Sequence, residues 1–492
     1  MESNGKYVLG VDIGTGSAKT ILSFAPGQVE SVYSEHYPTN HPGPGYSEQD
    51  PDQVIEAVFN CIRKAVTSQS KTPEAISLSA AMHSLIAVDK TGKPLMPMML
   101  WSDNRSAAAA AAIKNSPIGQ ELYQQTGTPI HAMSPLSKIK WLQSEQAQVF
   151  QKAYRFIGIK EYFLWHCMGE YVVDYNIASA MGLFDIRKHE WSSLALETLG
   201  ISKDVLPHPV PPGSVFKIMK PAIAAKMGIP IGTKLIIGGS DGCMAQVGSG
   251  AIREQVATLT IGTSGAARMI SHLPLVSGNG SLFTYALNEN LYLVGGAINN
   301  GGNAAQWFQK TFYPGTAVTD LDKQLSSAFA IPAGAEGLLC LPYLSGERAP
   351  IWDSQAKGVF LGMQHHHTLA HFNRAMIEGI CYSLKSVISE LQETLGNITS
   401  IHVSGGFTAS KDWVQLLCDV LELPCELYSH ADASALGASL LGWEALGATD
   451  AWTFDIGKPS AVFKAQKNGI YQKHYDLFKA AYERLAGLFP EI

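Results

Sequence analysis

The feature that most constrains the fold is a glycine-rich strand-turn-strand segment that occurs twice in the chain. In the first copy, apolar runs at residues 7–11 and 20–24 flank Asp12 and the tip residues Gly14, Thr15, Gly16 and Ser17. Both runs have the composition of β-strands, so the segment predicts a hairpin. Residues 11–22 (VDIGTGSAKTIL) match residues 259–270 (LTIGTSGAARMI), with Gly262 and Thr263 in place of Gly14 and Thr15. This repeat predicts two related lobes.

The hairpin tip is suited to bind phosphate groups. We expect Gly14 and Gly16 to let backbone N–H groups approach a polyanion and to adopt positive φ angles. Asp12 would repel phosphate unless a divalent cation lay between them, so we interpret it as a magnesium-side ligand that acts through water. An ordinary Asp- and Gly-rich turn is the alternative. The repeat favours phosphate, because two hairpins would clamp a nucleotide's phosphates from opposite sides of a cleft.

Two other phosphate-binding motifs are disfavoured in this segment. It contains no GxxxxGK[ST] sequence, and Lys19 occupies the position of the third glycine of a GxGxxG motif. The second hairpin has Thr260 where the first has Asp12, so only the first copy offers a carboxylate on the metal side.

Composition excludes several classes of protein. The 492 residues carry a net charge of −6 without a basic block, which argues against nucleic acid as a partner. No apolar run approaches the ~20 residues that cross a bilayer, and the seven cysteines form no CxxC pair. We therefore expect a cytoplasmic protein with reduced, mostly buried thiols and no membrane contact. The run at residues 365–367 (HHH) lacks further metal ligands in its surroundings, so a metal role there is disfavoured.

A cluster of polar residues in the first half suits a polyhydroxylated ligand. In WSDNR, Trp101 can stack on C–H groups, while Asp103 and Arg105 can bind hydroxyls or an acid group. The alternative is that Ser102 or Asp103 caps a helix at about residues 104–114. His83 is either a ligand-binding or a structural histidine.

Asp241 follows a predicted strand at residues 234–238 and precedes a helix of small residues. Catalytic groups of α/β proteins often lie at the carboxyl ends of strands. The alternative is that Ser240 or Asp241 only caps the helix. A second small-residue helix at about 432–447 resembles the first, and we expect the two to cross closely between the lobes as a hinge.

A glycine-rich turn follows the predicted strand at residues 400–404. Gly405 and Gly406, followed by Phe407, would let the backbone approach a flat ligand such as adenosine. A plain turn between strand and helix is the alternative.

Taken together and in order, VDIGTGSAK, MHS, WSDNR, GGSDG, IGTSG, LPYLSGERAP and SGGF resemble the FGGY carbohydrate kinases over nearly the whole chain. The resemblance implies an α/β fold of two duplicated actin-like/ribonuclease H-like ATPase lobes with a cleft between them, which we expect at residues 1–250 and 251–492. It also implies ATP and Mg²⁺ as cofactors.

The resemblance further implies roles for individual residues. Asp241 matches the family's catalytic base, which also contacts the substrate, and Asp12 matches the residue near Mg²⁺. The matching ATP-binding residues are Gly14, Thr15, Gly16, Ser17, Lys19, Gly262, Thr263, Gly405, Gly406 and Phe407. The matching substrate-binding residues are His83, Trp101, Asp103 and Arg105.

Within the family, MHSL, WSDNR and GERAPIW are similar to the gluconate kinases, which implies transfer of the γ-phosphate from ATP to D-gluconate to give 6-phosphogluconate. The carboxylate of that sugar acid would need a cation or amide donors, and Arg105 or His83 could serve. Xylulose or another polyol or ketose is the alternative substrate. A non-catalytic sugar sensor and an actin-like filament or chaperone ATPase are alternatives of other classes. The expected partners are the sugar acid or sugar and ATP, and a homodimer is among the expected assemblies.

Overall fold

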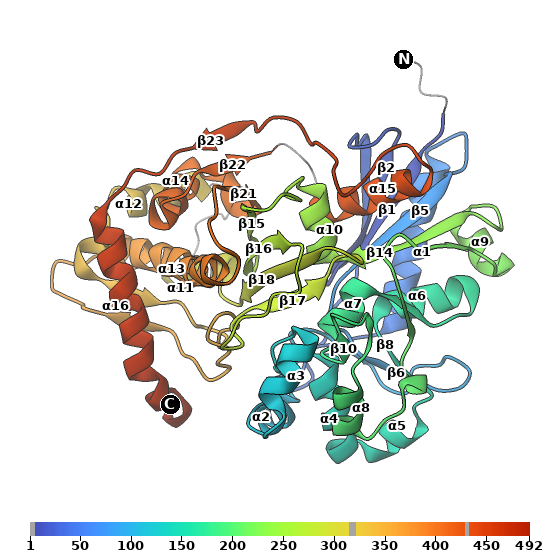
Figure 1. Ribbon diagram of the computed structural model, residues 1–492. Coiled ribbons are helices and arrows are strands. Elements are labelled where there is room, and N and C mark those ends of the chain that lie inside the picture. Colours follow the sequence, from blue (N-terminus) through green and yellow to red (C-terminus); the bar gives the residue numbers. More distant parts are fainter. Residues whose placement is uncertain (1–4, 314–320, 429–431) are drawn as a thin grey trace.

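The computed structural model describes residues 5–313, 321–428 and 432–492, which form two α/β lobes (Figure 1). The first lobe contains a six-stranded sheet of order β13-β14-β5-β1-β2-β3. Its strands are β1 (Val8–Ile13), β2 (Ser17–Ser23), β3 (Ser31–His36), β5 (Ala75–Ala80), β13 (Val215–Lys217) and β14 (Lys234–Ser240).

The second lobe contains a seven-stranded sheet of order β17-β18-β16-β15-β21-β22-β23. Its strands are β15 (Val256–Ile261), β16 (Gly265–Ser271), β17 (Phe283–Ala286), β18 (Tyr292–Ile298), β21 (Ser400–Ser404), β22 (Cys425–Leu427) and β23 (Ala461–Phe463). Shorter strands pair outside the two sheets: β4 (Glu48–Gln49) with β7 (Met98–Met99), β6 (Ile86–Val88) with β8 (Arg155–Ile157), β9 (Val172–Asp174) with β12 (His208–Val210), β10 (Phe184–Asp185) with β11 (Glu190–Trp191) and β19 (Leu339–Leu341) with β20 (Val359–Leu361).

The two large sheets share the topology of six strands, and β17 is an additional edge strand of the second sheet. In the first, β1 is antiparallel to β2 and parallel to β5, and β5 is parallel to β14. In the second, β15 is antiparallel to β16 and parallel to β21, and β21 is parallel to β22. Each sheet also ends in an antiparallel edge strand, β13 or β23. The duplication predicted from the repeated hairpin is therefore confirmed, and the architecture is that of actin-like and ribonuclease H-like ATPases.

Helices surround both sheets (Figure 1). The helices of the first half are α1 (Pro51–Thr67), α2 (Ala107–Lys114), α3 (Gly119–Thr126), α4 (Pro135–Glu145), α5 (Ala147–Lys152), α6 (Ile159–Met168), α7 (Tyr175–Ala180), α8 (Ser193–Leu199), α9 (Pro221–Met227) and α10 (Asp241–Gly248). Those of the second half are α11 (Gly302–Phe312), α12 (Leu321–Phe329), α13 (Leu369–Leu395), α14 (Lys411–Leu421), α15 (Ala433–Ala445) and α16 (Gly469–Leu485).

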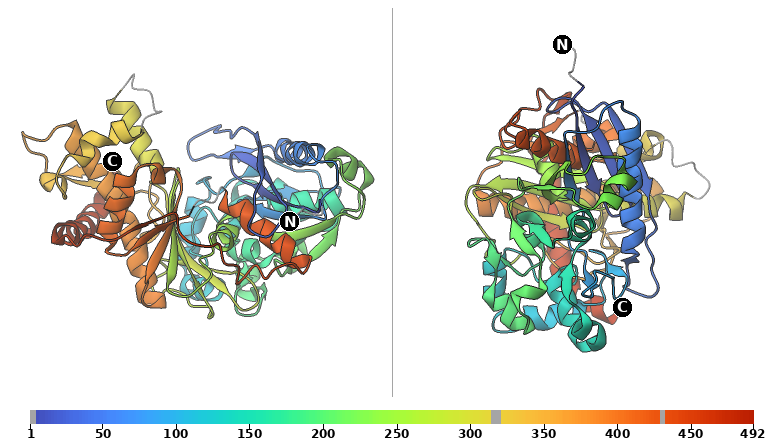
Figure 2. Two further views of the ribbon diagram at one scale, coloured as in Figure 1. Left: turned by 90° about the horizontal axis from the view of Figure 1, so that it is seen from above. Right: turned by 90° about the vertical axis from the view of Figure 1, so that its right-hand side faces the viewer.

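One helix of the second half packs on the first lobe. In Figure 2 the red-orange α15 lies against the blue strands, apart from the other orange and red helices. The approach is close enough to require glycine, because a Cβ atom on Gly10 of β1 would lie 2.2 Å from the carbonyl oxygen of Ala435. The division at residues 250 and 251 stays a prediction. The position of α15 shows that at least one helix from beyond residue 251 packs on the first lobe.

The two small-residue helices cross as predicted. A Cβ atom on Gly248 of α10 would lie 2.0 Å from the carbonyl oxygen of Ala433, and one on Gly437 of α15 would lie 1.9 Å from that of Met244. Small residues permit this backbone contact. Whether the crossing acts as a hinge stays a prediction.

One local prediction and one of the alternatives are wrong. Gly14 and Gly16 do not have positive φ angles; the tip closes instead through a hydrogen bond from Gly14 N to Ser17 O of 3.0 Å, which needs no left-handed residue. Neither Ser102 nor Asp103 caps α2, which begins at Ala107 after Ser106. Across the described part of the chain, no helix is long and apolar enough to cross a membrane.

Candidate active site between the two lobes

The first hairpin brings Asp12 and Lys19 to the same face of the first sheet. The two residues are directly opposite each other in the antiparallel register of β1 and β2, so their side chains project together. The Asp12 carboxylate is buried and accepts a hydrogen bond of 2.7 Å from Ser79 Oγ. Lys19 Nζ lies 2.6 Å from Oδ2 of Asp432, the residue that caps α15. The hairpin is thus joined electrostatically to a helix from the other half of the chain.

The environment of Asp12 favours its protonated form. Burial, together with the negative charges of Asp241 and Asp432, raises its pKa to about 7, whereas Ser79 and Lys19 act in the opposite direction. Three carboxylates around one lysine leave an excess of negative charge, which a divalent cation would compensate.

Asp241 is the first residue of α10 and is only partly buried. Ser240, at the end of β14, caps the helix by accepting a hydrogen bond from Cys243 N. The capping alternative therefore holds for Ser240, and Asp241 does not cap the helix. One Asp241 oxygen accepts a hydrogen bond of 2.7 Å from Gly242 N. Burial raises the pKa of Asp241, and the nearby Arg268 guanidinium opposes this shift.

The second hairpin and the glycine turn after β21 face one cavity. This cavity of about 550 Å³ is lined by Gly262 and Thr263 on one side and by Gly406, Phe407 and Trp413 on another. Gly405 has a φ angle of 106°, and a Cβ atom there would lie 2.3 Å from the carbonyl oxygen of Ile261. The glycine is therefore required for β15 and β21 to approach each other below the cavity.

Gln309 of α11 also lines this cavity. Both its side-chain nitrogen and oxygen are buried and have no hydrogen-bond partner in the part of the chain that the structure describes. Buried amides are normally paired, so Gln309 is suited to bind a polar planar group such as a nucleobase. Gln309 was not among the predicted site residues, because one glutamine within a helix gives no sequence signal.

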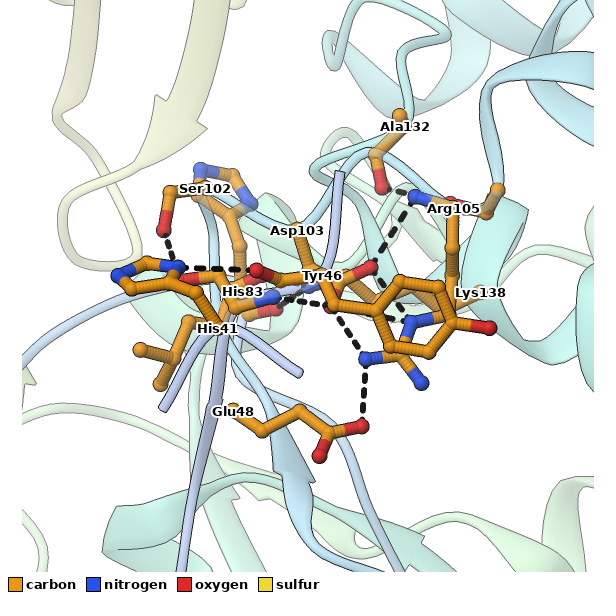
Figure 3. A network of polar contacts seen from close by, with 12 residues as sticks. His41, Tyr46, Glu48, His83, Ser102, Asp103, Arg105, Ala132 and Lys138 are labelled. Atoms are coloured by element: carbon orange, nitrogen blue, oxygen red, sulfur yellow. Dashed lines mark hydrogen bonds and ion pairs between the residues drawn. The ribbon is translucent and has the colours of Figure 1, made fainter. Parts of the chain in front are cut away.

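Trp101, Asp103 and Arg105 lie together, but the structure gives them different surroundings. The Trp101 indole donates a hydrogen bond of 3.1 Å to Thr15 Oγ1 at the tip of the first hairpin. The Arg105 guanidinium pairs with Asp103 and Glu48 and lies 3.7 Å from the centre of the Tyr46 ring, as Figure 3 shows.

Asp103 is completely buried and also accepts a hydrogen bond of 2.8 Å from Ser47 N. The expectation that Asp103 and Arg105 contact a ligand directly does not match this arrangement, because their charges already neutralise each other. The ion pair instead holds the loop that carries Trp101.

His83 is buried between the lobes. Its Nδ1 atom lies 2.8 Å from the carbonyl oxygen of Ala180, which can only accept, so this nitrogen carries the proton. Its Nε2 atom lies 3.5 Å from the Tyr285 hydroxyl. Burial and the nearby Lys138 lower the pKa of His83 to about 3. The histidine is therefore neutral at pH 7, and it cannot serve as the cation for an acid group.

Two arginines near these residues were not predicted. Arg268 of β16 lies beside Gly242, where an added Cβ atom would be 3.3 Å from Arg268 Nε. Arg348, in the GERAP segment between β19 and β20, lies 4.8 Å from the centre of the Trp101 ring. The signal for Arg268 was an arginine within an apolar strand, since buried charged residues are rare unless paired.

The residues of the HHH run lie apart from this site. His366 Nε2 lies 3.2 Å from Glu336 Oε2, and His371 Nε2 lies 3.3 Å from the same oxygen. Among the residues that the structure describes, no group of three or more His, Cys, Asp or Glu side chains is arranged to hold a metal ion. All seven cysteines are free and buried, as expected.

Comparison with known proteins agrees with this geometry. The models of the N-terminal and C-terminal domains of the FGGY family of carbohydrate kinases match residues 7–248 and 257–446. A gluconokinase from Bacillus subtilis is 39% identical over 456 residues, which cover 91% of this chain and 89% of the relative. Two structures from Lactobacillus acidophilus each cover 99% of both chains: a ligand-bound xylulose kinase with a TM-score of 0.94 and 33% identity, and a gluconate kinase with a TM-score of 0.92 and 32% identity. The chain belongs to the FGGY family of carbohydrate kinases and is a phosphotransferase that acts on a sugar hydroxyl.

Proposed function

We propose that this kinase transfers the γ-phosphate of ATP to a hydroxyl of a sugar acid, D-gluconate, and forms 6-phosphogluconate. The observation that supports the proposal best is the position of Asp241, which stands at the end of β14 and the start of α10, close to Asp12 and to Arg268. The 39% identity to a gluconokinase over 91% of the chain supports gluconate as the acceptor.

In the proposed reaction, Asp241 accepts the proton of the sugar hydroxyl. The hydroxyl oxygen forms a bond to the γ-phosphorus, the bond from that phosphorus to the bridging oxygen breaks, and ADP leaves. The raised pKa of Asp241 suits a group that must take up a proton. Phosphoryl transfer otherwise depends mainly on positioning and on neutralising charge.

The phosphate groups have two hairpin tips available. Around Gly16, in the first tip, an added Cβ atom would meet nothing within 4 Å, and around Gly262, in the second tip, it would meet only Ser264 O at 4.0 Å, so there is open space above both backbones. The N-termini of α10 and α15 meet nearby, where Ser434 Oγ donates a hydrogen bond of 3.1 Å to Asp241 O. Helix N-termini favour anions. Lys19 also lies there, and a bound phosphate would compete with Asp432 for the positive charge of its ammonium group.

The residues around Asp12 fit a magnesium ion. Mg²⁺ in kinases is usually held by one or two carboxylates, water and substrate phosphates, so a dedicated protein cage is not required. The buried Asp12 carboxylate would hold the ion through water, and the bound ion would neutralise charge on the transferred phosphate. The cavity around Gly262, Phe407 and Gln309 fits an adenosine group by its size and its unpaired amide.

A panel of acceptors tests the proposal. ADP release, coupled to NADH oxidation, is measured with gluconate, xylulose, ribulose and glycerol at equal concentrations. We expect the highest kcat/KM with gluconate. Faster turnover of xylulose would favour the second candidate, a xylulose kinase, which the ligand-bound xylulose kinase structure supports. ATP hydrolysis that is indifferent to every sugar would contradict both.

We also propose that the protein acts in the cytoplasm and assembles as a homodimer. The free, buried state of all seven cysteines supports a reducing compartment. Light scattering coupled to gel filtration tests the assembly, and a monomer mass at micromolar concentration would contradict it.

A further inference from the structure

Arg348 is buried and Arg268 is partly buried, and in the described part of the chain neither guanidinium lies within ion-pair distance of a carboxylate. Each has a buried Nε atom that finds no hydrogen-bond partner among the described residues, although Nη2 of Arg348 donates a hydrogen bond of 3.2 Å to the carbonyl oxygen of Ile298. Within the described ranges, arginine forms ion pairs only at Arg105 and Arg374. Buried charges are normally paired, because an unpaired charge loses its hydration without compensation. Two such guanidinium groups near one site therefore indicate that an anionic group from outside the chain completes it.

The carboxylates near the two arginines are committed elsewhere. Glu347 precedes Arg348, but its oxygens accept hydrogen bonds from the backbone N–H groups of Asn299 and Arg348 and from the side chain of Asn300. Asp241 acts on Arg268 electrostatically, yet it must stay free to accept a proton in the proposed reaction. Each carboxylate attracts its neighbouring arginine electrostatically, but neither forms an ion pair with it among the described residues.

The other neighbours are neutral and leave the positive charge in place. Burial lowers the pKa of His131 to about 3, with Arg348 and Lys138 acting in the same direction, so this ring is uncharged at pH 7 like that of His83. The buried Tyr285 phenol lies within electrostatic reach of Arg268, Arg348 and Asp241, and burial raises its pKa. Tyr285 thus lies near both guanidinium groups and Asp241, and its hydroxyl lies 3.5 Å from His83 Nε2.

We infer that Arg268 and Arg348 together bind the carboxylate of the acceptor and make the enzyme select sugar acids over neutral sugars. The inference rests on the proposed function. A guanidinium is always charged and presents planar N–H donors that match a carboxylate. The carboxylate of a sugar acid needs a cationic partner. Arg105 is held by Asp103 and Glu48, and His83 is neutral, whereas Arg268 and Arg348 can supply the positive charge.

The test compares D-gluconate with D-glucitol, which has the same six-carbon chain and a CH₂OH group in place of the carboxylate. ADP release is measured for the full-length wild-type enzyme and for Arg268→Met, Arg348→Met and Arg268→Lys. Arg63→Met is the matched control, because Arg63 is exposed on α1 and its loss changes the net charge equally. Circular dichroism and a thermal unfolding curve show whether each variant is folded.

We expect the wild type to prefer gluconate. Arg348→Met should lose roughly 10²–10³-fold in kcat/KM for gluconate and less than about threefold for glucitol, because a bound carboxylate is left without its charged partner. Arg268→Met should lose activity with both acceptors, because Arg268 also acts on the pKa of Asp241, but should lose more with gluconate than with glucitol. Arg268→Lys should recover part of the loss, and Arg63→Met should keep the wild-type ratio.

Equal losses with both substrates, or an unchanged ratio, would overturn the inference while the proposed function stands. A wild-type enzyme that phosphorylates no sugar acid would overturn the proposed function itself. If the methionine variants do not fold, phenylglyoxal labelling of the wild type decides the question. Gluconate, unlike glucitol, should then slow the modification of Arg268 and Arg348 as mapped by mass spectrometry, and equal labelling in both sugars would overturn the inference.

Discussion

Replacing Asp12 by asparagine should make the protein more stable at alkaline pH and inactive at the same time. The carboxylate is only 7% exposed, and burial, with Asp241 and Asp432 nearby, raises its pKa from 3.8 to about 7. Between these two pH values the folded protein holds a proton that the unfolded chain has released. Stability therefore falls as the pH rises through this window.

The size of the effect follows from the pKa difference. A pKa of about 7 in place of 3.8 corresponds to a free energy of unfolding that is lower by roughly 4 kcal/mol once Asp12 is fully ionised. Asparagine cannot ionise, so Asp12→Asn should exceed the wild type by a few kcal/mol at pH 8, and the gap should close toward pH 5.

Urea unfolding in EDTA at pH 5, 6, 7 and 8 measures this difference, and Asp455→Asn on an exposed loop is the matched control. Added MgADP should stabilise the wild type at pH 8 by more than it stabilises Asp12→Asn. Parallel pH profiles for the wild type and Asp12→Asn would refute the reasoning, because they would mean that Asp12 ionises in the folded protein as it does in the unfolded chain.

Two further predictions concern the frame of the site. Gly437→Ala would place a Cβ atom 1.9 Å from Met244 O at the crossing of α10 and α15. We expect this clash to lower the free energy of unfolding by about 3 kcal/mol. We also expect kcat to fall roughly 10²-fold, because α10 positions the catalytic aspartate. Gly469→Ala, where the Cβ atom meets nothing within 4 Å, is its control, and an unchanged melting temperature for Gly437→Ala would contradict the expectation. Arg105→Met leaves the buried Asp103 carboxylate unpaired and should lower the free energy of unfolding, measured with urea, by about 3–5 kcal/mol. Adding Asp103→Asn in the same chain should restore part of this loss. An Arg105→Met variant as stable as the wild type would disprove the role of the pair.

The features that the sequence predicts well are local or repeated. The hairpin at β1 and β2 is visible because the strand residues and tip residues are contiguous, and its second copy at β15 and β16 indicates the duplicated sheets. The position of Asp241 follows from the apolar run of β14 just before it. In each case the neighbours along the chain determine the structure.

The features that the sequence does not predict depend on partners far away in the chain. Trp101, Asp103 and Arg105 look alike as candidate ligands, and only the packing of the loop with Glu48 and Tyr46 turns Arg105 into an ion-pair partner. The roles of Arg268 and Arg348 follow from the approach of the lobes, which residue types in a single segment do not indicate. The packing of α15 on the first sheet is not predicted either, because its contacts are with strands far away in the sequence.

The most direct test of this account is the turnover of Asp241→Asn. ADP release with saturating ATP, Mg²⁺ and D-gluconate is measured for the wild type and the variant, and ATP binding is measured separately by calorimetry. We expect sugar-dependent ADP release by the wild type, and in the variant a loss of about 10²–10⁴-fold in kcat with ATP binding retained, because a general base contributes a factor of that size. A variant that turns over gluconate at the wild-type rate would contradict the central claim that Asp241 accepts the proton of the sugar hydroxyl.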